Sequence, residues 1–288
     1  MANREHLALL TTGGLTWVDW RKQYPHVQPD LRAVNLQGLQ LTGMDNGKSW
    51  EGMNLSYVNF DFAQLADVNF RGADLSCANF NGANLDSACL VGANLSLAHL
   101  CGVRLKQANL SDANLIGADL QNGMLRQVVL VNANLIGTNL SCVDLREGDL
   151  DSAKLCRANL SYGNLIGANL GMADLTLANL YAAELINVNL YRANLSQANL
   201  QQAHLNGANL YWGNLSYANL TNTDLRKAQL INVNFAGANL TGANIARANL
   251  RQAQNLSITQ IHSTRNWQDA KYDEQMRESL GLPLQICD

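Results

Sequence analysis

A five-residue apolar repeat runs through most of this 288-residue chain and restricts what the chain can fold into. Every fifth position from Leu55 to Leu250 is Leu, Phe or Ile, which makes forty consecutive positions. The residue two positions earlier is small, usually Ala and sometimes Gly, Val or Thr, with Met53 as the exception. A polar residue, mostly Asn or Asp, lies between the two. The repeating unit is therefore Ala-Asn-Leu followed by two variable residues.

A period of five fits neither a helix, which needs apolar residues about 3.6 positions apart, nor a straight strand, in which they alternate. In a short extended segment, residues two positions apart share a face. The small residue and the Leu therefore point to one side, and the polar residue between them points to the other. The two variable residues must turn the chain once per unit. We therefore predict a coil with an apolar interior.

The first variable residue after each Leu, here called the first corner residue, indicates how many units make one coil. At a spacing of twenty residues, nine pairs of first corner residues are identical, against two or fewer at spacings of 5, 10, 15 and 25. Such pairing is expected of residues that face each other on neighbouring strands. We therefore predict four units per coil and ten coils. At about 4.8 Å per coil, the rod is about 50 Å long.

These units resemble those of the pentapeptide-repeat family, which read Ala-(Asp/Asn)-Leu-x-x, and the resemblance covers about two thirds of the chain. It implies a β-class fold, a right-handed quadrilateral β-helix, and the handedness rests on the resemblance alone. The family is especially abundant in cyanobacteria. The C-terminal segment around Trp267 and Tyr272, with its Leu-Gly-Leu-Pro end, is similar to the tail of several cyanobacterial members.

Both ends of such a coil would expose a strand edge and an apolar cross-section, which solenoid proteins cover with capping elements. We therefore divide the chain into an N-terminal helical cap at 1–28, a pentapeptide-repeat β-helix at 29–256 and a C-terminal helical cap at 257–288. A partner-binding helix is the alternative for the first cap, and a dimerisation tail is the alternative for the second. The predicted helices are 4–10, 16–24, 258–266 and 273–280, the last with Asp273 as its N-cap.

An interruption separates the first units from the main run of repeats. Those first units end at Leu41, which is out of register with Leu55 because the two leucines are 14 residues apart. We predict an interrupting loop at 42–54. A simple structural insertion is the favoured interpretation, and in some members of the family such a loop engages a partner.

Composition and charge exclude several classes of protein. The formal net charge is −3 and the pI is about 5.9, so nothing favours direct binding of nucleic acid. We expect neither a signal peptide nor a membrane span, because the N-terminal apolar core is short and no run of eighteen apolar residues occurs. The cysteines lack the spacing of a zinc site and predict reduced thiols in a cytoplasmic protein. They are Cys77, Cys89, Cys101, Cys142, Cys156 and Cys287.

The sequence offers no catalytic constellation, and we predict neither a cofactor nor a metal site. His99 and His204 are 105 residues apart, which places them on adjacent sides of the coil, too far apart to share a ligand. His204 stacks between Glu184 and Asp224, each twenty residues away, and a surface charge ladder explains this column better than a metal. A convex rod without a cleft also excludes water poorly. We therefore predict that the protein is not an enzyme.

Two functions remain open. The first is a structural or regulatory scaffold that binds another protein through the outer faces of the rod, as a monomer rather than a dimer. The second is implied by the resemblance: some family members mimic double-stranded DNA and act on a topoisomerase. Mimicry needs a continuous anionic surface, which the basic column of Lys106, Arg126 and Arg146 opposes.

Outward aromatic residues gather late in the coil and give the candidate protein-binding residues: Tyr191, Tyr211, Trp212 and Tyr217. Tyr191 and Tyr211 share a column with Ile231 and Val131, and Trp212 adjoins Tyr211 at the same corner. Tyr and Trp are enriched where interfaces gain most of their binding energy. The alternative is structural, because stacked Tyr rings on neighbouring coils stabilise a ladder by about 0.2–1 kcal/mol per pair without any partner.

Overall fold

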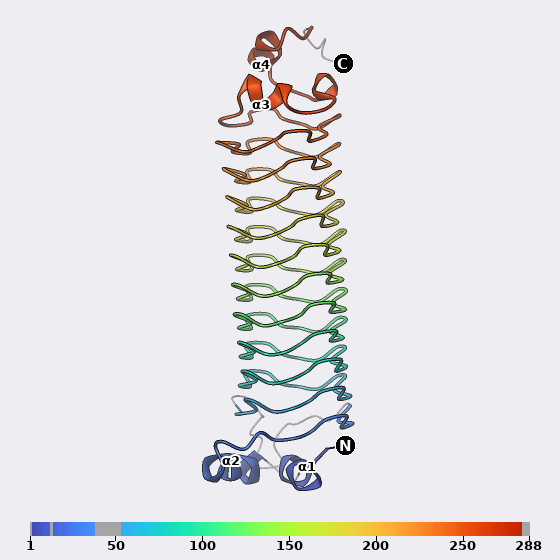
Figure 1. The fold of residues 1–288 in the computed structure, drawn as a ribbon, viewed down its shortest axis with the longest axis vertical. Helices are drawn as coiled ribbons and strands as arrows, with labels where there is room; N and C mark the ends of the chain where they lie inside the picture. The colour runs from blue at the N-terminus through green and yellow to red at the C-terminus, as the bar shows by residue number, and fades with distance from the viewer. Residues whose placement is uncertain (1, 12–13, 38–52, 284–288) are drawn as a thin grey trace.

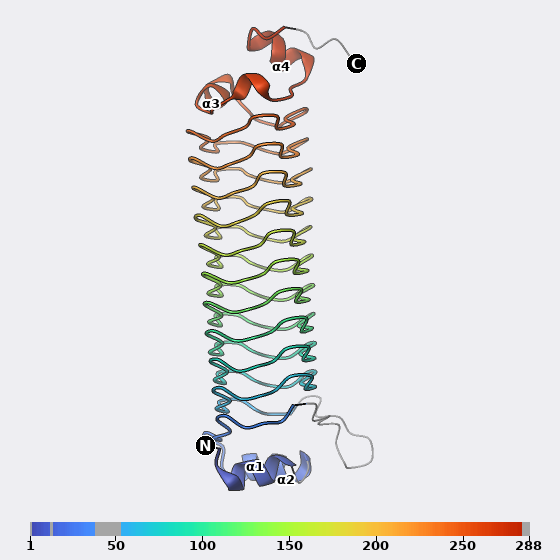
Figure 2. The same cartoon turned by 90° about the vertical axis from the view of Figure 1, so that its right-hand side faces the viewer.

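The chain forms a straight rod with short helices at both ends (Figures 1 and 2). This computed structural model describes residues 2–11, 14–37 and 53–283. Each side of the rod contributes a single bridge residue per coil rather than a longer strand, and the bridges are parallel. They join residues twenty apart, from Asn54 with Asp74 to Asn234 with Gln254. The predicted four units per coil are confirmed.

Backbone hydrogen bonds between coils hold the rod together. In the unit that begins at Leu75, the N–H groups of Leu75, Cys77 and Asn79 donate to carbonyl oxygens of neighbouring coils at 2.7–2.9 Å. The N–H of Ala78 donates to the carbonyl of Leu75 at 3.1 Å and closes a four-residue turn at the corner. Four of the five backbone N–H groups of this unit therefore donate to backbone carbonyls. Buried backbone groups need such partners, because they cannot bond to water.

In most units the side chain of an Asn or Asp accepts a hydrogen bond from the fifth backbone N–H. The N–H of the first corner residue Ser76 donates to Oδ1 of Asp74 at 3.1 Å, an Asx turn that fixes the corner. The side-chain amides also bond along the rod: Nδ2 of Asn94 donates to Asp74 at 3.0 Å, and Nδ2 of Asn114 donates to Asn94 at 3.1 Å. Where the polar position of the repeat is Asn or Asp, it therefore stabilises the corner that follows.

The second corner residue adopts a left-handed backbone conformation. Its φ is 59° at Tyr217, 61° at Trp212 and 64° at Gly237. With the hydrogen bond that closes the corner, a positive φ at this position alone defines a type II turn. Gly adopts it without strain, whereas other residues lose about 1–2 kcal/mol there. Side chains at this position point away from the rod.

The interior is apolar and closely packed. All forty Leu, Phe or Ile positions of the main run are at most 4% exposed. Two inward threonines replace the usual small residue, and each hydroxyl donates to a carbonyl of the preceding coil: Thr138 to Leu115 at 2.9 Å and Thr223 to Leu200 at 2.8 Å. The inward polar groups are therefore satisfied, as burial demands.

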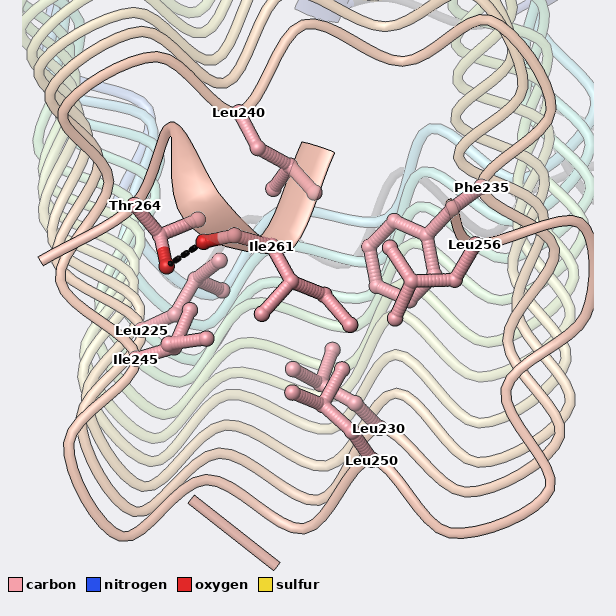
Figure 3. Close-up of a pocket in the computed structure, with 9 residues that line it drawn as sticks. All are labelled: Leu225, Leu230, Phe235, Leu240, Ile245, Leu250, Leu256, Ile261 and Thr264. Atoms are coloured by element: carbon pink, nitrogen blue, oxygen red, sulfur yellow. Dashed lines mark hydrogen bonds between the residues drawn. The ribbon is translucent and has the colours of Figure 1, made fainter. Parts of the chain in front are cut away.

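A void of about 10 Å³ lies where the last coil meets the C-terminal helices (Figure 3). Apolar side chains surround it, and its polar neighbour, the hydroxyl of Thr264, already donates to the carbonyl of Ile261 at 2.6 Å. A buried water needs a space of roughly this size and two to four polar partners. The void is thus a packing gap and offers no room for a ligand.

The N-terminal helices α1 (Arg4–Thr11) and α2 (Gly14–Gln23) lie across the start of the rod. The indole N–H of Trp17 donates to the carbonyl of Asn54 at 2.9 Å, and Trp17 is fully buried. Arg21 donates to the carbonyl and hydroxyl of Ser56, each at 3.2 Å, and burial lowers its pKa. Both predicted helices are confirmed, and α2 begins two residues earlier than predicted, at Gly14.

The first coil pairs with the second across a longer stretch of sequence than any later pair of coils does. Asp30 pairs with Asn59 and Asn35 with Gln64, residues 29 apart rather than twenty. The nine additional residues fall in the gap of the described chain, where residues 42–52 of the predicted interrupting loop lie outside the described residues. Met53 and Asn54, at the end of that predicted loop, already belong to the ladder.

The C-terminal segment continues the ladder for part of another coil. Arg265 bridges to Asn244 and Lys271 bridges to Asn249. Nε2 of Gln260 donates to the carbonyls of Phe235 and Ala238, each at 2.9 Å. These bonds hold the first helix of the C-terminal segment, which contains Gln260, against the last coil. The elements here are α3 (Ile258–His262), η1 (Trp267–Asp269) and α4 (Glu274–Ser279).

One predicted helix is too long. We predicted 258–266, but α3 ends at His262, because the carbonyl of Ser263 accepts from Gly242 at 2.8 Å and the N–H of Arg265 donates to Ala243 at 2.8 Å. Pairing with the last coil requires extended backbone there. The helix predicted at 273–280 is confirmed as α4, with Asp273 as its N-cap. The three-part domain division itself stays a prediction.

Replacing Leu150 with Ala should lower the free energy of unfolding by about 2–5 kcal/mol, because the side chain is fully buried and leaves a cavity. Met124→Ala is the control, since Met124 is 48% exposed, and it should change stability by less than about 0.5 kcal/mol. Equilibrium urea denaturation of both variants measures the difference. Equal effects of the two substitutions would contradict the inward placement of Leu150.

Removing residues 1–28 should cause the rods to associate end to end. The deletion takes away Trp17 and Arg21 and leaves the carbonyls of Asn54 and Ser56 and the apolar interior at this end of the rod uncovered. Static light scattering at several protein concentrations measures the association, with the full chain as control. A truncated chain that stays monomeric and melts at the same temperature would show that the N-terminal helices do not cover this end.

Candidate protein-binding surface

The four predicted binding residues lie on two neighbouring corners of the rod. The N–H of Arg192 donates to the carbonyl of Tyr211 at 2.9 Å, which places Tyr191 and Tyr211 one coil apart on the same corner. Trp212 is the second residue of that corner, and Tyr217 is the second residue of the next corner along the same coil.

Three of the four side chains extend into solvent. Tyr191 is 36% exposed, Trp212 is 52% exposed and Tyr217 is 69% exposed, while Tyr211 is half-buried. The two most exposed rings occupy the left-handed second corner position. The left-handed backbone is common to the second corner residues of all units, so the exposure of these two apolar rings is the feature that requires an explanation.

Neighbouring residues orient two of these rings. The guanidinium carbon of Arg192 lies 5.2 Å from the ring centroid of Tyr191, a cation–π distance. The ring of Tyr217 lies over Gly237 of the next coil, where a Cβ atom would be 2.6 Å from Cδ1 of the tyrosine. Gly237 therefore leaves the space in which the Tyr217 ring rests against the backbone.

A flat polar face separates the two aromatic corners. Nδ2 of Asn214 donates to Asn194 at 3.0 Å, and Nδ2 of Asn234 donates to Asn214 at 3.2 Å. Oδ1 of Asn214 also accepts from the N–H of Ser216 at 3.1 Å. The amides of this face are occupied by each other and by the backbone, and the exposed apolar side chains lie along its two edges.

The tyrosine stacking that the sequence left open occurs at another corner. The rings of Tyr162 and Tyr181 meet edge to face, with centroids 5.4 Å apart. Within the described part of the chain, Tyr191 and Tyr211 have no such contact with each other. Mutual ring packing therefore does not account for this tyrosine pair.

Sequence reasoning missed two apolar residues of the same surface. Met172 is 53% exposed and its N–H donates to the carbonyl of Tyr191 at 2.8 Å, one coil away. Leu177 is 41% exposed on the corner that carries Tyr217. Both are second corner residues, and neither matches the second corner residue twenty positions before or after it, so the repeat pattern gives no signal for them.

In the histidine column, His204 forms a hydrogen bond with one carboxylate. Nδ1 of His204 lies 3.0 Å from a carboxylate oxygen of Glu184, and Asp224 binds Arg226 instead. Throughout the described residues, no group of three His, Cys, Asp or Glu side chains is placed to hold a metal ion. The same residues contain no helix of the length and apolarity that crossing a membrane requires.

A four-sided parallel coil of five-residue units defines the β-helical solenoid class of proteins. The family described as Pentapeptide repeats matches this chain in eight copies over residues 46–210 and 214–252. The chain therefore belongs to the pentapeptide-repeat family, whose fold is a right-handed β-helix. A comparison with curated proteins finds no match.

Solved structures of the family resemble the chain to different degrees. HetL, a pentapeptide-repeat protein involved in heterocyst differentiation regulation from the cyanobacterium Nostoc sp. strain PCC 7120, is 31% identical. The match covers 79% of this chain and 96% of HetL, with a TM-score of 0.62. QnrB1, a plasmid-mediated fluoroquinolone resistance protein, is 18% identical over 68% of this chain and 97% of its own, with a TM-score of 0.47.

Gly237→Ala should displace the Tyr217 ring, because the new methyl group would overlap it. Gly137→Ala is the matched control: it lies on the same corner, its φ is 65° against 64°, and its Cβ would meet nothing within 4 Å. Both variants should lose about 1 kcal/mol of stability from the left-handed backbone. Only Gly237→Ala should also raise the nitration rate of Tyr217, followed by peptide mapping. Unchanged nitration would show that the ring does not rest on Gly237.

Proposed function

We propose that this protein is a non-enzymatic structural or regulatory scaffold that binds another protein through the outer faces of its β-helix. The contact surface is the pair of aromatic corners with Tyr191, Tyr211, Trp212 and Tyr217, extended by Met172. The observation that carries the proposal is the exposure of Trp212 and Tyr217 at second corner positions, where they contribute nothing to the core.

The physical chemistry of this surface supports a protein partner. Tyr and Trp combine a large apolar area with few rotatable bonds, so they lose little conformational entropy on binding. Both corners border one flat face whose amides are already hydrogen-bonded, so a partner need not desolvate unpaired polar groups there. The likeness to HetL, which is involved in regulating differentiation, fits a regulatory role.

Mimicry of double-stranded DNA on a topoisomerase is the second candidate, and the charges argue against it. A mimic needs an unbroken anionic surface, whereas Lys106, Arg126 and Arg146 occupy one corner on successive coils. A supercoiling assay with purified gyrase separates the two candidates, because the scaffold proposal expects no inhibition.

The thiols fit a reducing compartment, and we propose a cytoplasmic location on that basis. Five cysteines are free in the described residues: Cys77, Cys89, Cys101, Cys142 and Cys156. Cys287 lies outside the described residues. Free, partly exposed thiols persist where disulfides do not form.

Tyr191→Ser, Tyr211→Ser and Trp212→Gln together should abolish partner capture with little loss of stability. The control carries Tyr162→Ser, Tyr181→Ser and Phe62→Gln, three aromatic substitutions at another corner. Phe62 is 63% exposed. Each protein serves as bait in a lysate of the cell that encodes it, with quantitative mass spectrometry of captured proteins and a thermal melt of the bait.

The two readouts separate binding from structure. Loss of a captured protein by the first variant alone, at an unchanged melting temperature, supports the proposal. A lower melting temperature with every captured protein retained would show that the aromatic corner only stabilises the ladder, and the proposal would be wrong.

A further inference from the structure

A basic cluster occupies a different corner, nearer the N-terminal end of the rod. The N–H of Gln107 donates to the carbonyl of Arg126, and the N–H of Gln127 donates to the carbonyl of Arg146, each at 3.0 Å. Lys106, Arg126 and Arg146 are therefore first corner residues on three successive coils. This concentration of positive charge is unexpected in a chain of formal net charge −3.

Carboxylates neutralise only part of this cluster. Arg104 binds Asp86, and Arg146 binds Asp144 with Nε 2.7 Å from the carboxylate. The hydrogen bond from Arg146 keeps the pKa of Asp144 below its ordinary value, and the charge of Arg126 adds to this shift.

Lys106 and Arg126 keep their charge available. Both side chains are exposed, and within the described residues neither has an ion-pair partner. Nearby Glu147 accepts a hydrogen bond from Gln127 at 2.8 Å rather than from either cation. Two unpaired cations thus lie about one coil spacing apart on the same corner.

The cluster surrounds a shallow depression of about 240 Å³. The exposed thioether side chain of Met124 lies in its lining, so the depression offers apolar contact as well as charge. Its walls are Asp86, Arg104, Lys106, Met124, Arg126 and Asp144.

The same corner becomes apolar towards the C-terminus. The next two first corner residues are Ile166 and Ile186, and both are half-buried. From Lys106 to Ile186 the corner spans four coils, about 19 Å, which an extended peptide covers with about six residues. Along this corner, from the N-terminal towards the C-terminal end of the rod, the side chains therefore change from basic to apolar.

We propose that this corner binds an extended peptide segment of a partner protein that is acidic at one end and apolar at the other. Lys106 and Arg126 bind the carboxylates of the acidic end, and Ile166 and Ile186 contact the apolar end. The site lies on another corner from the aromatic surface, so its test does not depend on the function proposed above.

The composition of the corner favours a peptide over a nucleic acid. Nucleic-acid binding draws on many phosphate contacts along a basic stripe. Here the stripe is short, carboxylates of Asp86 and Asp144 flank it, and it ends in two isoleucines. A phosphate backbone longer than two or three nucleotides would meet an apolar surface.

Fluorescence anisotropy with a synthetic peptide tests the site. The probe is fluorescein-labelled Glu-Asp-Glu-Ser-Leu-Ile-Leu, titrated with the full-length protein at 50 mM and 200 mM NaCl. The doubly substituted Lys106→Glu, Arg126→Glu protein should bind it at least about tenfold more weakly, and salt should weaken binding by the wild type. The matched control is Lys154→Glu, Arg157→Glu, which makes the same charge change at exposed residues on the other side of the rod.

A second pair of changes tests the apolar end. Ile166→Ser with Ile186→Ser should weaken binding of this peptide, and should leave unchanged the binding of a peptide in which Ser replaces Leu and Ile. Circular dichroism and thermal melting of each variant check that the rod stays folded.

Three results would overturn the proposal. The first is equal binding by the wild type and the Lys106→Glu, Arg126→Glu protein. The second is equal weakening by the Lys154→Glu, Arg157→Glu control, which would indicate general electrostatic attraction. The third is tighter binding of a labelled twelve-nucleotide single strand that is lost with Lys106 and Arg126, which would make the corner a nucleic-acid site.

Discussion

The fold depends on one backbone arrangement that recurs at every corner of the rod. An inward Leu at every fifth position can be buried only if the chain turns once per unit, and the turn requires a left-handed second corner residue. The turn leaves the N–H of the first corner residue without a backbone acceptor. In most units the side chain of the Asn or Asp before the Leu accepts this hydrogen bond, as Asp74 does from Ser76. Apolar burial, turn geometry and hydrogen bonding thus require the same five-residue pattern.

This arrangement leaves the two corner residues of each unit largely free of structural duty. The carbonyl of the first and the N–H of the second form hydrogen bonds between coils whatever the side chains are, so many residue types occur at both positions, with backbone strain at the second. The side chains at the corners are therefore where binding specificity can reside, as the contrast between the Trp212 corner and the Lys106 corner illustrates.

The terminal segments solve the problem that a repeating ladder creates at its ends. Trp17 and Arg21 donate hydrogen bonds to the first complete coil, while Gln260 donates to carbonyls of the last. At the C-terminal side the chain also extends the ladder itself, through Arg265 and Lys271. The two ends therefore satisfy exposed backbone in different ways, one with helical side chains and the other with additional pairing.

The sequence by itself determined the coil, the inward and outward positions and most of the helical ends, because each is encoded in a few neighbouring residues. Its four sides followed from identical corner residues twenty positions apart, because such residues pair between coils. The tertiary structure decided what depends on contacts between coils. Pairing with Gly242 and Ala243 ended α3 earlier than its sequence suggested. Likewise, the ring of Tyr162 packs against the ring of Tyr181, whereas the ring of Tyr191 packs against the guanidinium of Arg192. Such contacts depend on side-chain rotamers and on the neighbouring coil. Periodicity fixes which residues face outward, but only the packed coils fix which of them touch.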